Sequence, residues 1–197
     1  IKKVAKITLS KNTLDFGLEQ SLLTFDITNV GNAGDVSWEI TNVNVDWVNV
    51  TPLTGTTSMD KSSAVKVELD REKLPEGKQT TTILVNAYGE SFPVTINAEK
   101  EIKVAKITLS KTTLDFGLDY SSLTFDITNV GNAGDVSWTI TGVDVDWVKV
   151  FPVSGTTSMD KSSAVKVEVD REKMAEGRNA TTILVEAYGE SFPVTIK

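Results

Sequence analysis

Residues 24–38 read TFDITNVGNAGDVSW, and the same letters return at residues 124–138. Phe25 and Ile27 alternate with polar neighbours, and Val36 and Trp38 do the same after the turn-forming GNAG at residues 31–34. A period of two indicates a β-strand that buries one face, and clustered Gly and Asn indicate a turn. This stretch therefore predicts two strands separated by a turn.

The same alternation recurs along the rest of the repeat. The positions expected to face inward are Leu23, Phe25 and Ile27; Val36, Trp38 and Ile40; Val65, Val67 and Leu69; Ile83, Val85 and Ala87; and Phe92, Val94 and Ile96. Turn residues separate these runs at intervals of about 8–12 residues, a spacing typical of antiparallel sandwiches. No segment keeps a helical period, and DREKLPEG at residues 70–77 is short and interrupted by Pro75. Pro93 lies inside the last run, which predicts an edge position or a bulge there.

The sequence consists of two tandem copies of one repeat. At an offset of 100 residues, 76 of the 97 aligned positions are identical. A period of that length is a complete domain rather than a solenoid unit. We predict an all-β chain of two tandem immunoglobulin-like antiparallel β-sandwiches of about seven strands each, at residues 1–98 and 99–197. The join at residues 97–103 has no Gly, Pro or Ser, so we expect a nearly fixed, extended arrangement of the two.

Composition restricts the classes of function. The net charge of −7 is shared almost evenly by the two halves. An evenly acidic surface disfavours nucleic acid and anionic lipid as partners. No apolar run is long enough to span a bilayer, and any export signal is expected upstream of Ile1.

Residues suited to catalysis or metal binding are scarce. Cys and His are absent, which removes thiolates, disulfides, the usual general base and the commonest zinc ligands. Asp144 and Asp146 share a strand face, but the further acids of a calcium loop are missing. No nucleophile elbow or phosphate-binding glycine pattern occurs. We therefore predict no enzyme, no cofactor and no metal site.

Trp47 and Trp147 leave two interpretations open. In VNVDWVNV, residues 43–50, the apolar alternation changes phase between Trp47 and Val48. A phase change indicates a bulge or a strand that moves between sheets. In one interpretation Trp47 closes the first inward set, Val48 opens the second, and the indole caps the core. In the other, the indole faces outward.

The outward interpretation would make a binding platform in the second repeat. There Trp147, Lys149 and Phe151 would lie two residues apart on one strand face, whereas Thr51 replaces the phenylalanine in the first repeat. Tyr120 and Tyr188, near turns, are further candidates for exposed ligand-binding aromatics. Exposed aromatic side chains also serve protein contacts.

Several motifs together resemble the BACON domain, a Bacteroidetes-associated immunoglobulin-like module. They are TLDFG at residues 13–17, DWV at 46–48, TPLTGTT at 51–57 and VKVELDREKLPEGKQTTTILV at 65–85, with FPVSGTT and VKVEVDREKMAEGRNATTILV in the second repeat. Met174 and Ala175 depart from the Leu-Pro of this pattern. The first third also resembles ASH-type and other bacterial immunoglobulin-like repeats.

The resemblance implies an exported or cell-surface module, extracellular or periplasmic, carried beside other domains of a longer chain. It implies either a spacer role or the binding of polysaccharide or mucin glycans, and it brings no catalytic residues. Trp47 and Trp147 occupy the family's DWV position, without a transferable role. We expect a non-catalytic extracellular module, a spacer in preference to a glycan binder, with protein–protein adhesion as the third alternative.

Overall fold

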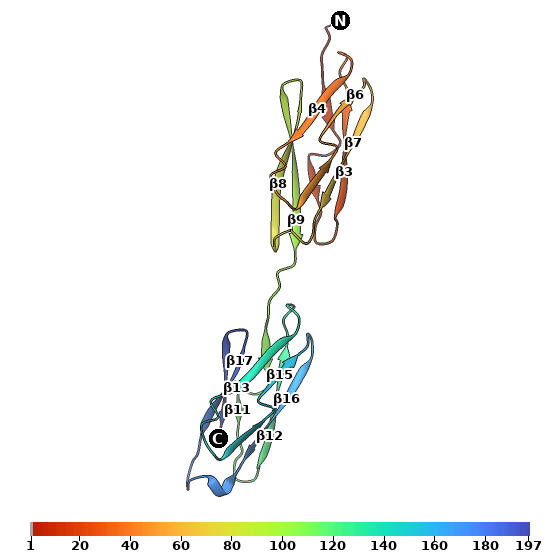
Figure 1. The fold of residues 1–197 in the computed structure, drawn as a ribbon. Helices are drawn as coiled ribbons and strands as arrows, with labels where there is room; N and C mark the ends of the chain where they lie inside the picture. Colours follow the sequence, from red (N-terminus) through yellow and green to blue (C-terminus); the bar gives the residue numbers. More distant parts are fainter. Residues whose placement is uncertain (1) are drawn as a thin grey trace. The chain divides into compact units, whose positions relative to one another are not determined.

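The computed structural model describes residues 2–197, which divide into two compact units (Figure 1). Unit 1 extends to Ile102 and unit 2 comprises Lys103–Lys197. The last strand of unit 1 is β9 (Glu90–Lys100). Among these residues the helical content is one 3-10 turn, Arg171–Lys173, and no helix is long and apolar enough to cross a membrane.

Each unit is a sandwich of a four-stranded and a five-stranded sheet. Unit 1 contains β1 (Ile7–Leu9), β2 (Thr13–Asp15), β3 (Leu22–Asn29), β4 (Val36–Thr41), β5 (Val48–Thr51), β6 (Thr54–Thr57), β7 (Ser62–Leu69), β8 (Gly77–Ala87) and β9. Their orders are β1-β3-β7-β5 and β2-β9-β8-β4-β6. These contain the four-plus-three arrangement of an immunoglobulin constant-type sandwich, with β2 and β6 added at the edges of the second sheet.

Unit 2 repeats this plan. Its strands are β10 (Ile107–Leu109), β11 (Thr113–Leu114), β12 (Ser122–Asn129), β13 (Val136–Thr141), β14 (Val148–Phe151), β15 (Ser154–Thr157), β16 (Ser162–Val169), β17 (Thr181–Ala187) and β18 (Glu190–Ile196). The sheets run β10-β12-β16-β14 and β11-β18-β17-β13-β15.

The all-β fold and the tandem sandwiches are confirmed, but the strand count is higher than predicted. Within the described residues each unit has nine strands rather than about seven. The excess arises where one length of chain serves both sheets. β1 and β5 belong to the four-stranded sheet, whereas β2 and β6, which follow them closely in sequence, belong to the five-stranded sheet. Each switch divides one expected strand into two short ones.

The predicted inward positions form the core of unit 1. All are buried except Leu23 and Phe92, which are partly buried and pack against the core. Pro93 lies opposite Leu84 of β8, and the pairing of β9 with β2 starts only at Thr95. The described ladder at the proline therefore has one partner strand, as at a sheet edge, where a missing N–H is tolerated.

A buried tryptophan joins the two sheets of unit 1. The Nε1–H group of Trp38, on β4, donates to Oγ1 of Thr57 on β6 at 2.9 Å. That hydroxyl lies 2.7 Å from Oγ of Ser63, on β7 of the opposite sheet. Unit 2 repeats both contacts with Trp138, Thr157 and Ser163. A buried indole N–H needs such an acceptor, because an unsatisfied donor costs about 1–3 kcal/mol.

Gly55 allows this indole to lie flat against β6. A Cβ atom built on Gly55 would be 2.3 Å from Cζ2 of Trp38, far inside van der Waals contact. The repeated GTT of residues 55–57 therefore has a structural explanation. The glycine makes room for the ring, and the second threonine accepts its N–H bond.

A buried asparagine organises the turn after β3. Asn29 donates through Nδ2 to the carbonyls of Gly34 and Thr57 at 2.9 and 3.0 Å, and its Oδ1 accepts the N–H of Gly31 at 3.1 Å. The side chain is fully buried, and both ends of its amide are satisfied. It therefore holds the GNAG turn against β6.

We expect Gly55→Ala to destabilise unit 1 by about 1–3 kcal/mol, because the added methyl forces the Trp38 ring out of its packed position. Urea unfolding followed by tryptophan fluorescence measures this change. Thr54→Ala, on the exposed part of the same strand, is the control and should shift the midpoint far less. Equal shifts would contradict the close-contact explanation.

Candidate functional site

Trp47 and Trp147 lie in the cores of their units. Their side chains are 5% and 7% exposed, and each belongs to the buried cluster of its own unit. Val48, the next residue, is buried as well, so the alternation changes phase where the sequence indicated. The structure therefore has the capping arrangement, and neither indole is placed to form an exposed platform.

A shallow hollow lies beside Trp47, where β5 begins and β7 ends. Its volume is about 600 Å³, and its walls include Leu22, Asp46, Trp47, Glu68, Asp70 and Lys73. Because Trp47 is buried, little of its side chain is exposed in the hollow. The hollow is a charged surface depression over the core.

Phe151 is exposed, as the platform hypothesis requires. Its side chain is 56% exposed on β14, an edge strand, where it pairs with Lys166 of β16. Two residues along the ladder Lys149 pairs with Glu168, and the bond from Lys166 holds the pKa of Glu168 below its ordinary value. Phe151 thus lies among charged side chains, without Trp147 beside it on that face.

Tyr188 has a structural role at the tip of the β17–β18 hairpin. Its hydroxyl accepts the N–H of Ile107 at 3.2 Å, which ties the tip to β10 of the other sheet. Its ring meets Phe192 edge to face with centroids 5.8 Å apart. Tyr188 is 38% exposed and has a φ of 41°, which is unusual for a residue other than Gly or Asn. Tyr88 repeats the arrangement in unit 1.

Tyr120 lies at the opposite end of unit 2. It is 61% exposed in the turn between β11 and β12, and its carbonyl accepts a bond from Nη2 of Arg171 at 2.5 Å. Because β11 runs parallel to β18 and pairs with its last residues, this turn is at the end where β18 finishes, whereas Tyr188 precedes its start. The structure therefore does not bring Phe151, Tyr120 and Tyr188 together.

Arg71 is an organising residue that the sequence analysis did not identify. Its Nη1 donates to the carbonyls of Gly17 and Glu99 at 3.1 and 2.8 Å, and its Nη2 donates to those of Phe16, Gly17 and Gln20. The only sequence signal is the DREK of residues 70–73, repeated at 170–173. Because most positions are identical in the two copies, the repetition of one motif does not single out Arg71.

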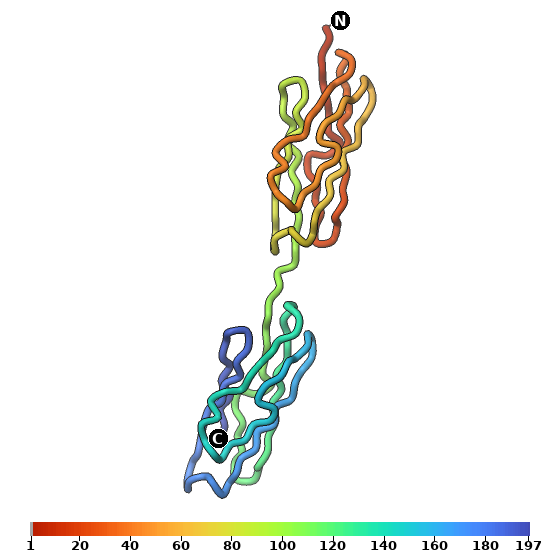
Figure 2. Tube along the Cα trace, in the orientation of Figure 1, coloured from red at the N-terminus to blue at the C-terminus, as the bar shows by residue number. Residues whose placement is uncertain are grey.

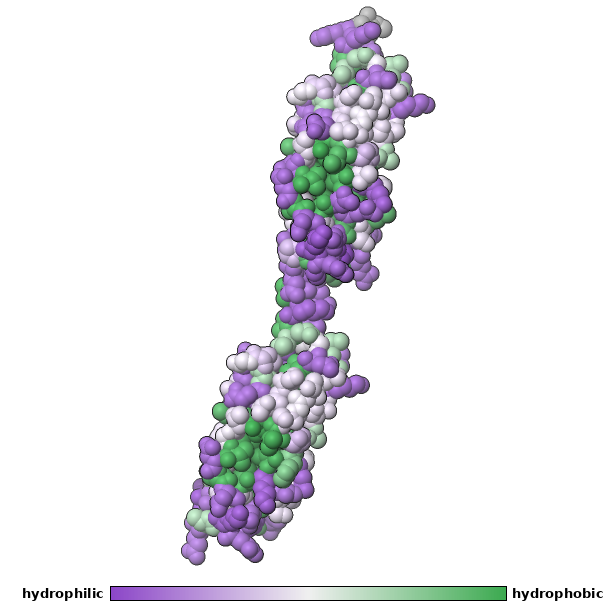
Figure 3. Space-filling model, in the orientation of Figure 1, coloured by the Kyte–Doolittle hydropathy of each residue, from purple (hydrophilic) through white to green (hydrophobic). Residues whose placement is uncertain are grey.

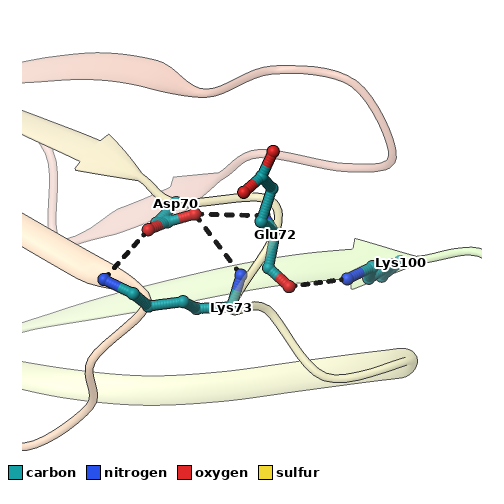
Figure 4. A network of polar contacts seen from close by, with 4 residues as sticks. All are labelled: Asp70, Glu72, Lys73 and Lys100. Atoms are coloured by element: carbon teal, nitrogen blue, oxygen red, sulfur yellow. Dashed lines mark hydrogen bonds and ion pairs between the residues drawn. The ribbon is translucent and has the colours of Figure 1, made fainter.

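The residues next to Arg71 form a polar network with Lys100 at the end of β9 (Figure 4). Oδ1 of Asp70 accepts the backbone N–H groups of Glu72 and Lys73, and Oδ2 lies 3.1 Å from Nζ of Lys73. Lys100 donates from Nζ to the carbonyl of Glu72 at 3.0 Å. The bonds from Lys73, followed by that from Glu72, hold the pKa of Asp70 below its ordinary value. The network fastens the end of β9 to the segment that follows β7.

The surface offers an apolar patch but no clustered ligand set. In the face shown in Figure 3, each unit has one apolar patch bordered by polar side chains. Among residues 2–197 no three acidic, His or Cys side chains are grouped so that they could hold a metal ion.

The sequence profile of the viral BACON domain matches both halves of the chain, at residues 6–99 and 106–197. No curated protein matches the sequence.

Solved structures resemble the chain at low sequence identity. A protein of unknown function from Porphyromonas gingivalis W83 is 18% identical, with 96% of this chain and 97% of that chain covered and a TM-score of 0.41. The periplasmic chaperone SfaE is 10% identical, with coverages of 97% and 99% and a TM-score of 0.44. An ASH/PapD-like domain of human CEP192 is 13% identical over 49% of this chain and 87% of its own, with a TM-score of 0.42.

We expect Trp147→Ala to cost about 3–5 kcal/mol of stability in unit 2, because it removes a large buried ring and leaves a cavity. Urea unfolding measures the loss, and acrylamide quenching should show that the native indole is protected. Phe151→Ala, at an exposed position, is the matched control and should change the unfolding midpoint little. A loss at Trp147 no greater than at Phe151 would contradict the buried position.

Asp70 should titrate below its ordinary value of 3.8. Because its pKa is lower in the folded than in the unfolded state, its ionised form stabilises unit 1 above the unfolded value, and this contribution is lost as pH falls through the folded value. NMR titration of the carboxyl carbon measures the midpoint. Lys73→Met should raise that midpoint, and an unchanged midpoint would show that Lys73 is not the cause.

Proposed function

Both halves of this chain belong to the viral BACON domain family, and on that basis we propose that the pair is a non-catalytic spacer within a longer surface-exposed or secreted protein. The spacer separates neighbouring domains of the parent chain. The family is named for viral proteins, whereas the resemblance of the sequence motifs implied a module of bacterial proteins.

One observation carries this proposal: the repeated motif residues are used inside each unit. Trp38 and Thr57 join the sheets, Asn29 holds a turn, and Trp47 completes the core. Arg71 binds backbone carbonyls of its own unit. Motifs of a ligand-binding module would be expected to direct some of these groups toward solvent.

Glycan binding by unit 2 is the second candidate, and Phe151 favours it. An exposed aromatic ring on the outer face of a sheet, flanked by amino and carboxylate groups, can stack against the apolar face of a sugar while polar groups bond its hydroxyls. Adhesion to another protein is the third candidate, and the apolar patch on each unit supports it (Figure 3).

Affinity electrophoresis through gels that contain plant or mucin polysaccharides separates the first two candidates. The matched variant is Phe151→Thr, which installs the residue present at Thr51 in the first copy. A spacer should migrate with the same relative mobility in every gel, as wild type and as variant. Retardation of the wild type that disappears in a folded Phe151→Thr chain would overturn the spacer proposal in favour of a glycan site.

A further inference from the structure

The first and last parts of unit 1 are joined by a short parallel pairing. β2 runs parallel to β9, with Thr13 opposite Thr95, Leu14 opposite Ile96, and Asp15 opposite Asn97. Backbone bonds continue the pairing in both directions: the N–H of Thr95 donates to Asn12, that of Phe16 to Asn97, and that of Glu99 to Gly17, at 2.9, 2.9 and 3.0 Å. All other strand pairs among the described residues of unit 1 are antiparallel.

The two chain ends of unit 1 lie at opposite ends of its sandwich. In Figure 2 the chain enters unit 1 at one end, and the segment that leaves β9 exits at the other. Tension on the chain would load β1 and its pairing with β3 first, and once β1 has separated it would pull β2 and β9 in opposite directions along their own axes. We propose that the β2–β9 pairing is a shear clamp, a set of hydrogen bonds that resists extension because tension loads all of them together.

The direction of loading decides how such bonds fail. In an antiparallel hairpin pulled at its open end, the bonds break one after another, and each carries the force alone. In a sheared pair they must break almost together, so the barrier to rupture is higher for the same bonds. Forced unfolding is governed by the unfolding barrier rather than by equilibrium stability. The direction of pulling alone can therefore give the hairpin and the sheared pair different rupture forces.

Arg71 reinforces the clamp from the side. One guanidinium binds carbonyls on the β2 side, at Phe16 and Gly17, and the carbonyl of Glu99 on the β9 side. Hydrogen bonds from a charged donor are stronger than those between neutral groups. Sliding of the two segments past each other would break these bonds together with the backbone bonds, and Lys100 adds a bond to Glu72 beyond them.

Unit 2 contains the same parallel pairing. Its clamp pairs Thr113 with Thr195 and Leu114 with Ile196, and the bonds from Thr195, Phe116 and Lys197 extend it. Arg171 donates to the carbonyls of Phe116 and Tyr120, which both lie on the β11 side. These are the counterparts of the bonds from Arg71 to Phe16 and Gln20 in unit 1.

The inference rests on the proposed spacer role, in which tension along the chain is the relevant load. Single-molecule force spectroscopy on the full chain tests it. The chain has no cysteine, so introduced cysteines are unique attachment points. Lys3→Cys with Lys103→Cys applies shear to unit 1, whereas Lys78→Cys with Lys103→Cys pulls the β8–β9 hairpin open from its end.

We expect the sheared attachment to rupture at a several-fold higher force than the hairpin attachment in the same folded unit. Equal forces would overturn the shear clamp without bearing on the spacer role, which the polysaccharide gels test separately.

Arg71→Met tests the reinforcement, and the hairpin attachment of the same variant is its control. Arg71→Met should lower the rupture force of sheared unit 1 and change the hairpin force little. Urea unfolding of each variant shows that the units are folded. If Arg71→Met weakens the fold too far, Arg71→Lys, which keeps the charge but not the forked geometry, replaces it. A sheared force unaffected by either variant would overturn the role of Arg71.

Discussion

The hydrogen bond from the buried indole of Trp38 to Thr57 is the contact on which the sandwich depends. Thr57 passes the connection to Ser63, so one short chain of polar groups runs from the five-stranded to the four-stranded sheet. Immunoglobulin domains commonly place a tryptophan against a disulfide that joins their sheets. This chain has no cysteine, and here the threonine and serine hydroxyls connect the sheets beside the indole.

Much of the fold could be predicted from sequence because burial in a sandwich follows a period of two. That period identified the inward faces of the long strands and the phase change at Trp47, and the repeat at a constant offset of 100 residues identified two domains. It could not reveal β1 and β2 as separate strands, because three residues are too few to show alternation. Their division depends on which sheet offers free backbone groups, which is a property of the assembled sandwich.

The candidate site was less predictable for a related reason. Exposure of Phe151 followed from strand parity, but whether Trp47 faced inward depended on the position of the strand switch. Arg71 escaped notice because its partners are backbone carbonyls between Phe16 and Gln20 and at Glu99, distant in sequence from Arg71. A carbonyl becomes available as an acceptor only once tertiary structure has left it unpaired, and residue identity does not encode that.

The division of strands between sheets has a consequence for how two such similar neighbours fold. Tethered domains with 76 of 97 positions identical meet at high effective concentration, where exchange of strands between neighbours competes with correct folding. Long, open sheet edges would favour that exchange. Here the edge strands β1, β2, β5 and β6 have only three or four residues each, and Pro52 separates β5 from β6. A strand from the other domain could form only a few backbone hydrogen bonds with such short edges. Strand exchange is therefore disfavoured, and each domain forms its sheets from its own strands.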